Sequence, residues 1–225
     1  MAAIGKVTKK HDELYTPRLL VEPILNELIK FTQKFRNKYN RDPVILCPFD
    51  TKESEFVSAF STYYKVKFGH LFSGQDFFTH DYGEWDVCIS NPPFSKKLEV
   101  FKKLDEMDKP WAMVMNAMAL NYHEIINYFV NNEPEIMFFD KRVSYDSHPS
   151  SFGSCYICRN FLSKKIICVS LSNNNTGKYY TPSGMYKSKI SFFNMLKIDP
   201  PNIVRTKVFS ERPKKSAKDI HYKNY

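Results

Sequence analysis

The stretch from Asp86 to Phe94, DVCISNPPF, decides how the rest of the sequence is interpreted. Its first half is an apolar run, which predicts a buried strand. The run ends at Asn91, two prolines and an aromatic ring, and proline lacks the backbone N–H that a sheet ladder requires. The strand therefore has to stop here, in a stiff turn whose carbonyl groups remain available as acceptors.

Helical and strand-like segments alternate on both sides of this turn. Pro17 to Lys38 has the spacing of a long helix, with Thr16 as the expected N-cap. Further strands are predicted at residues 44–47, 64–68, 85–89 and from Trp111, and further helices at residues 53–62, 96–107 and 121–132. Two strands, EIMFFDKRVSY and GSCYICRNF, then follow one another, and KIICVSL is a candidate for one more. This order predicts an α/β fold, a mostly parallel sheet covered on both faces with a C-terminal antiparallel hairpin.

Composition and charge divide the chain near residue 172. The 225 residues are 43% hydrophobic, which suits one ordinary domain with some additional chain. Residues 172–225 carry eleven basic and three acidic side chains, a net charge of +8, whereas residues 1–171 carry +1. We therefore expect a domain at 1–171 and a basic extension at 172–225, with a polyanion, most simply nucleic acid, as partner; a solvated basic tail is the alternative.

Several classes of protein are disfavoured by what the sequence lacks. No apolar run approaches the roughly 20 residues that a membrane-spanning helix needs, and the N-terminus has no signal-peptide pattern. Five scattered cysteines suggest reduced, buried thiols, and Cys155 and Cys158 would point to opposite faces of a strand rather than to one metal. We expect a cytoplasmic protein with no metal site and no association with a membrane. The sequence does not specify the oligomeric state.

The Asn91-Pro92-Pro93-Phe94 turn has the groups needed to hold an aromatic amine. The Asn91 amide oxygen and the Pro92 carbonyl are two acceptors that can converge on the two N–H groups of a planar amine. Phe94 offers a flat apolar surface on which a ring can stack. Acceptors on both protons draw the nitrogen out of conjugation with the ring, so its lone pair can attack an activated methyl group without a strong base. A lone asparagine here would more simply cap the following helix.

DVCISNPPF resembles the [DNS]-PP-[FYW] motif of amino-group methyltransferases that use S-adenosylmethionine, above all the adenine-N6 DNA methyltransferases. The chain from Asp12 to about Leu171 is similar to small phage-type members. The resemblance implies a Rossmann-like methyltransferase fold and transfer of a methyl group to adenine N6 in DNA, with the base flipped out of the duplex. In this interpretation Asn91 and Pro92 position the amine, Phe94 stacks on the base, and Pro93 belongs to the same catalytic turn.

Four further segments carry the resemblance, namely DELYTP, ILCPFD, GQDFF and SSFGSCYICRNF. The last of these suggests Phe152 as a clamp on the flipped base. Target recognition and phosphate contacts are assigned to the basic extension, represented by Lys187, Lys189, Arg205 and Lys207. The residues that the resemblance assigns to the cofactor are Tyr15, Thr16, Pro48, Asp50, Asp76 and Phe77.

Two departures from the family pattern leave alternatives open. The loop after the first strand, Cys47 to Thr51, has none of the family's glycines, and Gly69 and His70 stand where an acidic residue should hold the ribose. These departures favour one alternative, a non-catalytic nucleic-acid-binding protein that kept the fold and lost the cofactor. The other alternative is the same chemistry on RNA adenine, because nothing in the sequence reads a 2′-hydroxyl. A phage or mobile-element origin, implied by the resemblance alone, suggests roles in restriction evasion or self-marking, as in restriction-modification.

Overall fold

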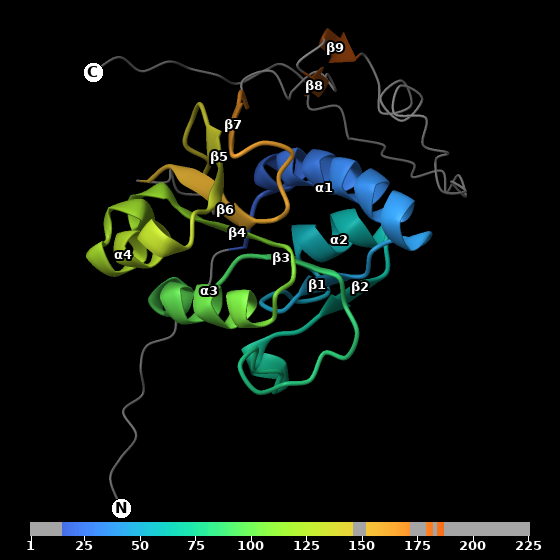
Figure 1. Cartoon of the computed structure of the whole chain (residues 1–225), viewed down its shortest axis with the longest axis horizontal. Helices are drawn as coiled ribbons and strands as arrows, with labels where there is room; N and C mark the ends of the chain where they lie inside the picture. Colours follow the sequence, from blue (N-terminus) through green and yellow to red (C-terminus); the bar gives the residue numbers. More distant parts are fainter. Residues whose placement is uncertain (1–14, 146–151, 172–178, 182–183, 187–225) are drawn as a thin grey trace, which may run out of the picture.

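The computed structural model describes residues 15–145, 152–171, 179–181 and 184–186, and seven strands within them form one mixed sheet (Figure 1). The order across the sheet is β2-β1-β3-β4-β6-β5-β7. Two further strands, β8 (Tyr179–Thr181) and β9 (Gly184–Tyr186), form a separate antiparallel pair. The strands of the main sheet are β1 (Ile45–Cys47), β2 (Val66–Phe68), β3 (Val87–Ser90), β4 (Trp111–Asn116), β5 (Glu135–Phe139), β6 (Ser154–Arg159) and β7 (Ile166–Val169).

The sheet is mostly parallel, with one reversed strand. Strands β2, β1, β3 and β4 are parallel to one another, and β5 is parallel to β7. Only β6, among these seven strands, is antiparallel to both of its neighbours, β4 and β5. The expected α/β architecture and the late antiparallel pair are therefore confirmed, and KIICVSL contributes β7.

Helices cover both faces of the sheet. Helices α1 (Arg18–Tyr39) and α2 (Glu55–Ser61) pack on one face, and α3 (Lys97–Glu106) and α4 (His123–Asn131) on the other (Figure 1). Because side chains alternate across a strand, Cys158 faces the first cluster and Cys155 the second. The prediction that these two cysteines point to opposite faces is confirmed.

The expected capping of α1 by Thr16 is wrong. The N-cap residue is Pro17, with φ −65° and ψ 147°, and it makes no side-chain capping bond. Because Pro17 takes the extended conformation itself, the helix begins one residue later than predicted, at Arg18. The Thr16 hydroxyl is instead buried, with no hydrogen-bond partner among the described residues.

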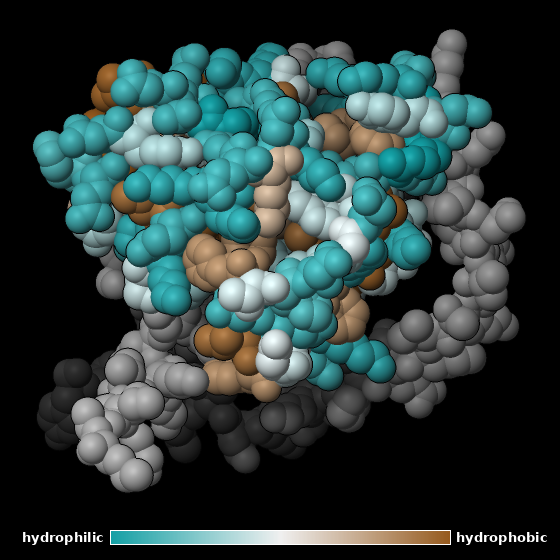
Figure 2. All heavy atoms as spheres, turned by 60° about the horizontal axis from the view of Figure 1, so that its bottom comes forward, coloured by the Kyte–Doolittle hydropathy of each residue, from teal (hydrophilic) through white to brown (hydrophobic). Residues whose placement is uncertain are grey.

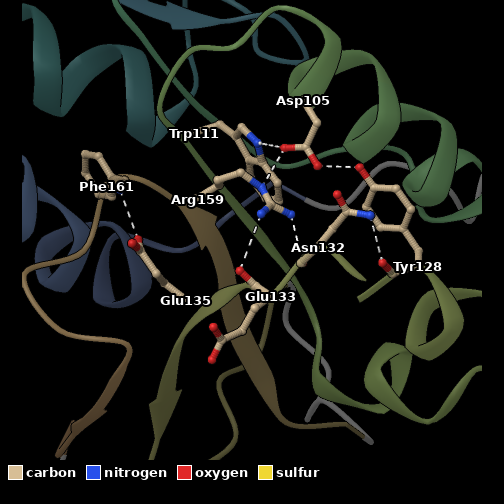
Figure 3. A network of polar contacts seen from close by, with 8 residues as sticks. All are labelled: Asp105, Trp111, Tyr128, Asn132, Glu133, Glu135, Arg159 and Phe161. Atoms are coloured by element: carbon tan, nitrogen blue, oxygen red, sulfur yellow. Dashed lines mark hydrogen bonds and ion pairs between the residues drawn. The ribbon is translucent and has the colours of Figure 1, made fainter. Parts of the chain in front are cut away.

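A polar network ties the helices to the sheet at the amino end of β4 (Figure 3). Arg159 Nε lies 2.7 Å from Asp105 Oδ1, and the Trp111 indole donates to the same oxygen at 2.9 Å. The Tyr128 hydroxyl donates to the other Asp105 oxygen. Arg159 also donates to the Asn132 carbonyl oxygen at 2.8 Å. These contacts join α3, β4, α4 and β6, at the edge of the sheet opposite the predicted site.

The surface is mainly polar on the side shown in Figure 2, where apolar side chains form small separate groups. No helix in the described part of the chain combines the length and the apolar character that crossing a membrane requires.

Candidate functional site

Strand direction brings the predicted site residues to one edge of the sheet. Strands β1, β3 and β4 are parallel, so the segments that follow them emerge at the same edge. Strand β6 is reversed, so the segment that precedes it reaches that edge as well; Ser154 pairs with Asn116, and the Ala117 N–H donates to the Gly153 carbonyl at 2.8 Å. Ligands of open α/β sheets bind at this kind of edge.

The Asn91-Pro92-Pro93-Phe94 turn follows β3 directly. Phe94 begins a short 3₁₀ turn, η2 (Phe94–Lys96), and α3 begins at Lys97. The N-cap residues of these two elements are Pro93 and Lys96, and neither makes a side-chain capping bond. Asn91 is therefore not the cap of the following helix, which removes the simplest structural explanation for it. Asn91 interacts with other groups of the protein.

Ser90 connects this turn to the loop that follows β1. Its hydroxyl is fully buried, donates to Asp50 Oδ2 and accepts from the Phe49 N–H at 3.3 Å. Ser90 is thus a candidate site residue that sequence reasoning missed, because it was counted as the last residue of an apolar run. The available signal was a hydroxyl at the end of a buried strand, next to a turn with predicted chemistry.

Asp50 is a buried carboxyl group, with 6% of its surface exposed. Burial raises its pKa to about 7, although hydrogen bonds from Ser90 and Ser54 oppose the shift. Its backbone N–H donates to the Gly69 carbonyl oxygen at 3.0 Å, which joins the loops after β1 and β2. The loop is thus held by bonds from Asp50 and Phe49 rather than by glycines.

The segment between β2 and β3 closes over the β1 loop. The Phe77 ring is buried and meets the Phe49 ring edge-on, with 5.0 Å between centroids. Asp76 Oδ1 accepts from the Phe78 N–H at 3.0 Å, which fixes the turn that presents Phe77. Asp76, Phe77 and the β1 loop therefore lie together.

Tyr82 also connects this segment to the β1 loop. Its hydroxyl lies 3.1 Å from the Gln75 carbonyl oxygen and 3.4 Å from that of Pro48, so Pro48 belongs to the same cluster of loops. Burial raises the pKa of Tyr82 to about 12, so the hydroxyl keeps its proton at neutral pH and acts as a donor. A Cβ atom on Gly69 would lie 2.8 Å from the Tyr82 ring, so only glycine permits this close approach.

Phe152, predicted as a clamp, lies beside Phe94. The two ring centroids are 6.4 Å apart and the rings meet edge to face. Tyr145 supports Phe152, with 5.7 Å between ring centroids, and its own hydroxyl lies 2.8 Å from Ser154 Oγ. The reversal of β6 explains this meeting of two residues that are far apart in the sequence.

Tyr15 and Thr16 precede α1 at the same edge. The guanidinium of Arg18, in the first turn of α1, lies 3.4 Å from Glu55 at the start of α2, and α2 follows the Asp50 loop. Tyr15 is 62% exposed, whereas Thr16 is buried. Thr51 Oγ1, like Thr16 Oγ1, is a buried oxygen without a hydrogen-bond partner in the described part of the chain.

Some predicted residues lie outside the described part of the chain. They are the four basic residues assigned to DNA phosphates: Lys187, Lys189, Arg205 and Lys207. Within the described residues, no group of three or more histidine, cysteine, aspartate or glutamate side chains is placed to hold a metal ion.

The arrangement combines a buried acid, aromatic rings and a proline-fixed turn at one sheet edge. It offers acceptors to a ligand that carries hydroxyl or amino groups, and flat surfaces to a ligand that carries rings.

No family model matches the sequence, and a search of curated proteins finds no significant match.

Proposed function

We propose that the protein transfers a methyl group from S-adenosylmethionine to the N6 amino group of adenine in DNA. The mostly parallel sheet with one reversed strand supports the Rossmann-like methyltransferase fold that the sequence resemblance implies. The observation that carries the proposal is the meeting of three separately predicted segments at one edge: the Asp50 loop, the Asn91–Phe94 turn and Phe152.

In the proposed reaction, Asn91 and Pro92 hold the amine. The Asn91 side-chain oxygen and the Pro92 carbonyl oxygen each accept one N–H bond, so the nitrogen lone pair turns toward the methyl group. With S-adenosylmethionine bound, this nitrogen would accept the methyl group as the carbon–sulfur bond breaks, and the methylated amine would release one proton to water. By holding the amine in one orientation, Asn91 and Pro92 would lower the entropic part of the barrier.

The residues at the edge fit S-adenosylmethionine, which supplies an electrophilic methyl group when it is bound. Asp50 offers a carboxylate, and Thr16 and Thr51 offer buried hydroxyl groups that have no partner among the described residues. Phe77 offers an apolar surface for an adenine ring. A ligand with hydroxyl groups, an ammonium group and a purine ring can pair with this set of groups.

The rings of Phe94 and Phe152 form the proposed pocket for the flipped adenine. Extrusion of a base from the stack costs a few kcal/mol, and stacking on aromatic side chains offsets part of that cost. Phe94 would stack on the base, and Phe152, held edge-on against Phe94, would close the pocket from the β6 side.

Transfer of a labelled methyl group to unmethylated DNA tests the proposal. We expect the unaltered protein to transfer label to DNA. Asn91→Ala should lower the rate of transfer at least 100-fold, because it removes the side-chain oxygen that accepts a hydrogen bond from the amine in the transition state. Asn116→Ala is the matched control, since Asn116 ends the neighbouring strand and its side chain accepts from the Met118 N–H at 2.9 Å. Equal transfer by the unaltered protein and Asn91→Ala would contradict the assignment of the site.

One observation favours a second candidate, a non-catalytic nucleic-acid-binding protein. The Phe49 and Asp50 N–H groups bond within the protein, so they are not the open amides of a glycine-rich cofactor loop. Calorimetry with S-adenosylmethionine separates the two candidates. Binding with transfer supports the enzyme, whereas nucleic-acid binding without cofactor binding supports the second candidate. Transfer to RNA but not to DNA would instead show that the substrate is RNA.

A further inference from the structure

A cavity lies beside the segment that follows the Asn91–Phe94 turn. It lies between the beginnings of α3 and α4 and has a volume of about 400 Å³. Because both helices begin at the carboxyl edge of the sheet, the cavity shares that edge with the proposed adenine pocket. The side chains that carry the argument are Lys97, Glu99, Asn121, Tyr122 and Glu124.

Lys97 links this cavity to the adenine pocket. Its ammonium group donates to the Phe94 carbonyl oxygen at 2.7 Å and lies 4.7 Å from the centre of the Tyr122 ring. One side chain therefore holds both the end of the proline turn and an aromatic ring of the cavity. The Tyr122 ring remains 52% exposed, so it offers a surface to a ligand.

The charges around the cavity separate into two regions. The cavity lining carries two acids, Glu99 and Glu124, against one lysine, Lys97, so it disfavours a phosphate inside the cavity. Lys96, exposed on the side of the turn toward Phe78, has its ammonium group 5.3 Å from the centre of that ring. The cavity thus suits a ring that carries amino groups, and the Lys96 side suits a phosphate.

We propose that this cavity binds the nucleotide next to the flipped adenine, with its base stacked on Tyr122; this inference rests on the proposed function. The carboxylates of Glu99 and Glu124 accept from exocyclic amines, so the cavity prefers adenine, cytosine or guanine to thymine. Lys96 contacts the adjoining phosphate. The described domain thereby contributes to DNA binding without the basic extension.

Binding of single-stranded DNA tests this site without requiring methyl transfer. The probe is a fluorescein-labelled 12-mer of deoxyadenosine, measured by anisotropy on the full chain in about 0.2 M salt, which screens phosphate contacts. We expect Tyr122→Ala to raise the Kd about tenfold and Tyr122→Phe to leave it within twofold, because the flat ring carries the stacking. A deoxythymidine 12-mer should bind the unaltered protein more weakly than the deoxyadenosine 12-mer.

Tyr39→Ala is the matched control. Tyr39 is 49% exposed, and the Lys38 ammonium group lies 4.8 Å from the centre of its ring. Tyr39 also lines a cavity of about 430 Å³ at the opposite edge of the sheet. We expect Tyr39→Ala to bind as the unaltered protein does. The inference is overturned if Tyr122→Ala binds normally, if Tyr122→Phe is as weak as Tyr122→Ala, or if Tyr39→Ala weakens binding equally. Failure of methyl transfer with the expected binding pattern would reject the proposed reaction and leave Tyr122 as a nucleic-acid contact.

Discussion

Replacement of Asp50 by asparagine should remove a pH-dependent loss of stability. Asp50 is buried, and its folded-state pKa is raised from 3.8 to about 7, mainly by burial. A folded protein with a raised carboxyl pKa keeps a proton that the unfolded chain has already released. The free energy of unfolding therefore falls as the pH rises from about 4 toward 7, and it levels off above 7.

The size of this effect follows from the pKa shift. A shift from 3.8 to about 7 is about three units, and at 1.36 kcal/mol per unit it costs about 4 kcal/mol once Asp50 is ionised. About 3 kcal/mol of that cost falls between pH 5 and pH 8. Asp50→Asn has nearly the same shape and cannot ionise, and its side-chain oxygen can still accept from Ser90.

Urea unfolding of both proteins across pH 5 to 8 measures the difference. The free energy of unfolding of Asp50→Asn, minus that of the unaltered protein, should increase by about 3 kcal/mol over this range. Other titrating groups cancel because both proteins share them. A difference that stays constant with pH, or that decreases as the pH rises, would refute the assignment of a raised pKa to Asp50.

Three further predictions concern the scaffold, and urea unfolding measures each of them. Ser90→Ala should lower the free energy of unfolding by about 2 kcal/mol at pH 8 and by less at pH 5, because the Ser90 hydroxyl bonds more strongly to Asp50 when that carboxyl group is ionised. An equal loss at both pH values would contradict this. Arg159→Met should cost about 3 kcal/mol by leaving the Asp105 charge unpaired, whereas Lys165→Ala, which breaks an exposed ion pair, should cost below about 1 kcal/mol. Gly69→Ala should cost about 1–3 kcal/mol, and much less in a Tyr82→Ala background; additive losses would show that the clash is absent.

The spacing of apolar residues predicted the fold class because each element has its own period. The alternation of strands and helices, and the late pair of strands, led directly to a mostly parallel sheet with one reversed strand. Boundaries were less accurate, as in the strand predicted at residues 44–47 and observed at Ile45–Cys47. The Thr16 cap was wrong because Pro17 adopts the cap conformation itself.

Contacts between distant segments could not be predicted from local patterns. Ser90 reaches Asp50 only because β1 and β3 pair in parallel, with Leu46 beside Cys88. Phe152 was selected through the family resemblance, and its contact with Phe94 depends on the direction of β6. The cavity beside Tyr122 forms between α3 and α4, which follow the adjacent strands β3 and β4. No local sequence pattern specifies that arrangement.

Identification of the product tests the central proposal most directly. Unmethylated DNA would be incubated with the protein and S-adenosylmethionine, digested to nucleosides and analysed by mass spectrometry, beside an Asn91→Ala reaction. The account predicts N6-methyldeoxyadenosine with the unaltered protein and at least a 100-fold loss of it with Asn91→Ala. No methylated nucleoside from a protein that folds and binds S-adenosylmethionine, or a product that persists unchanged in Asn91→Ala, would contradict it.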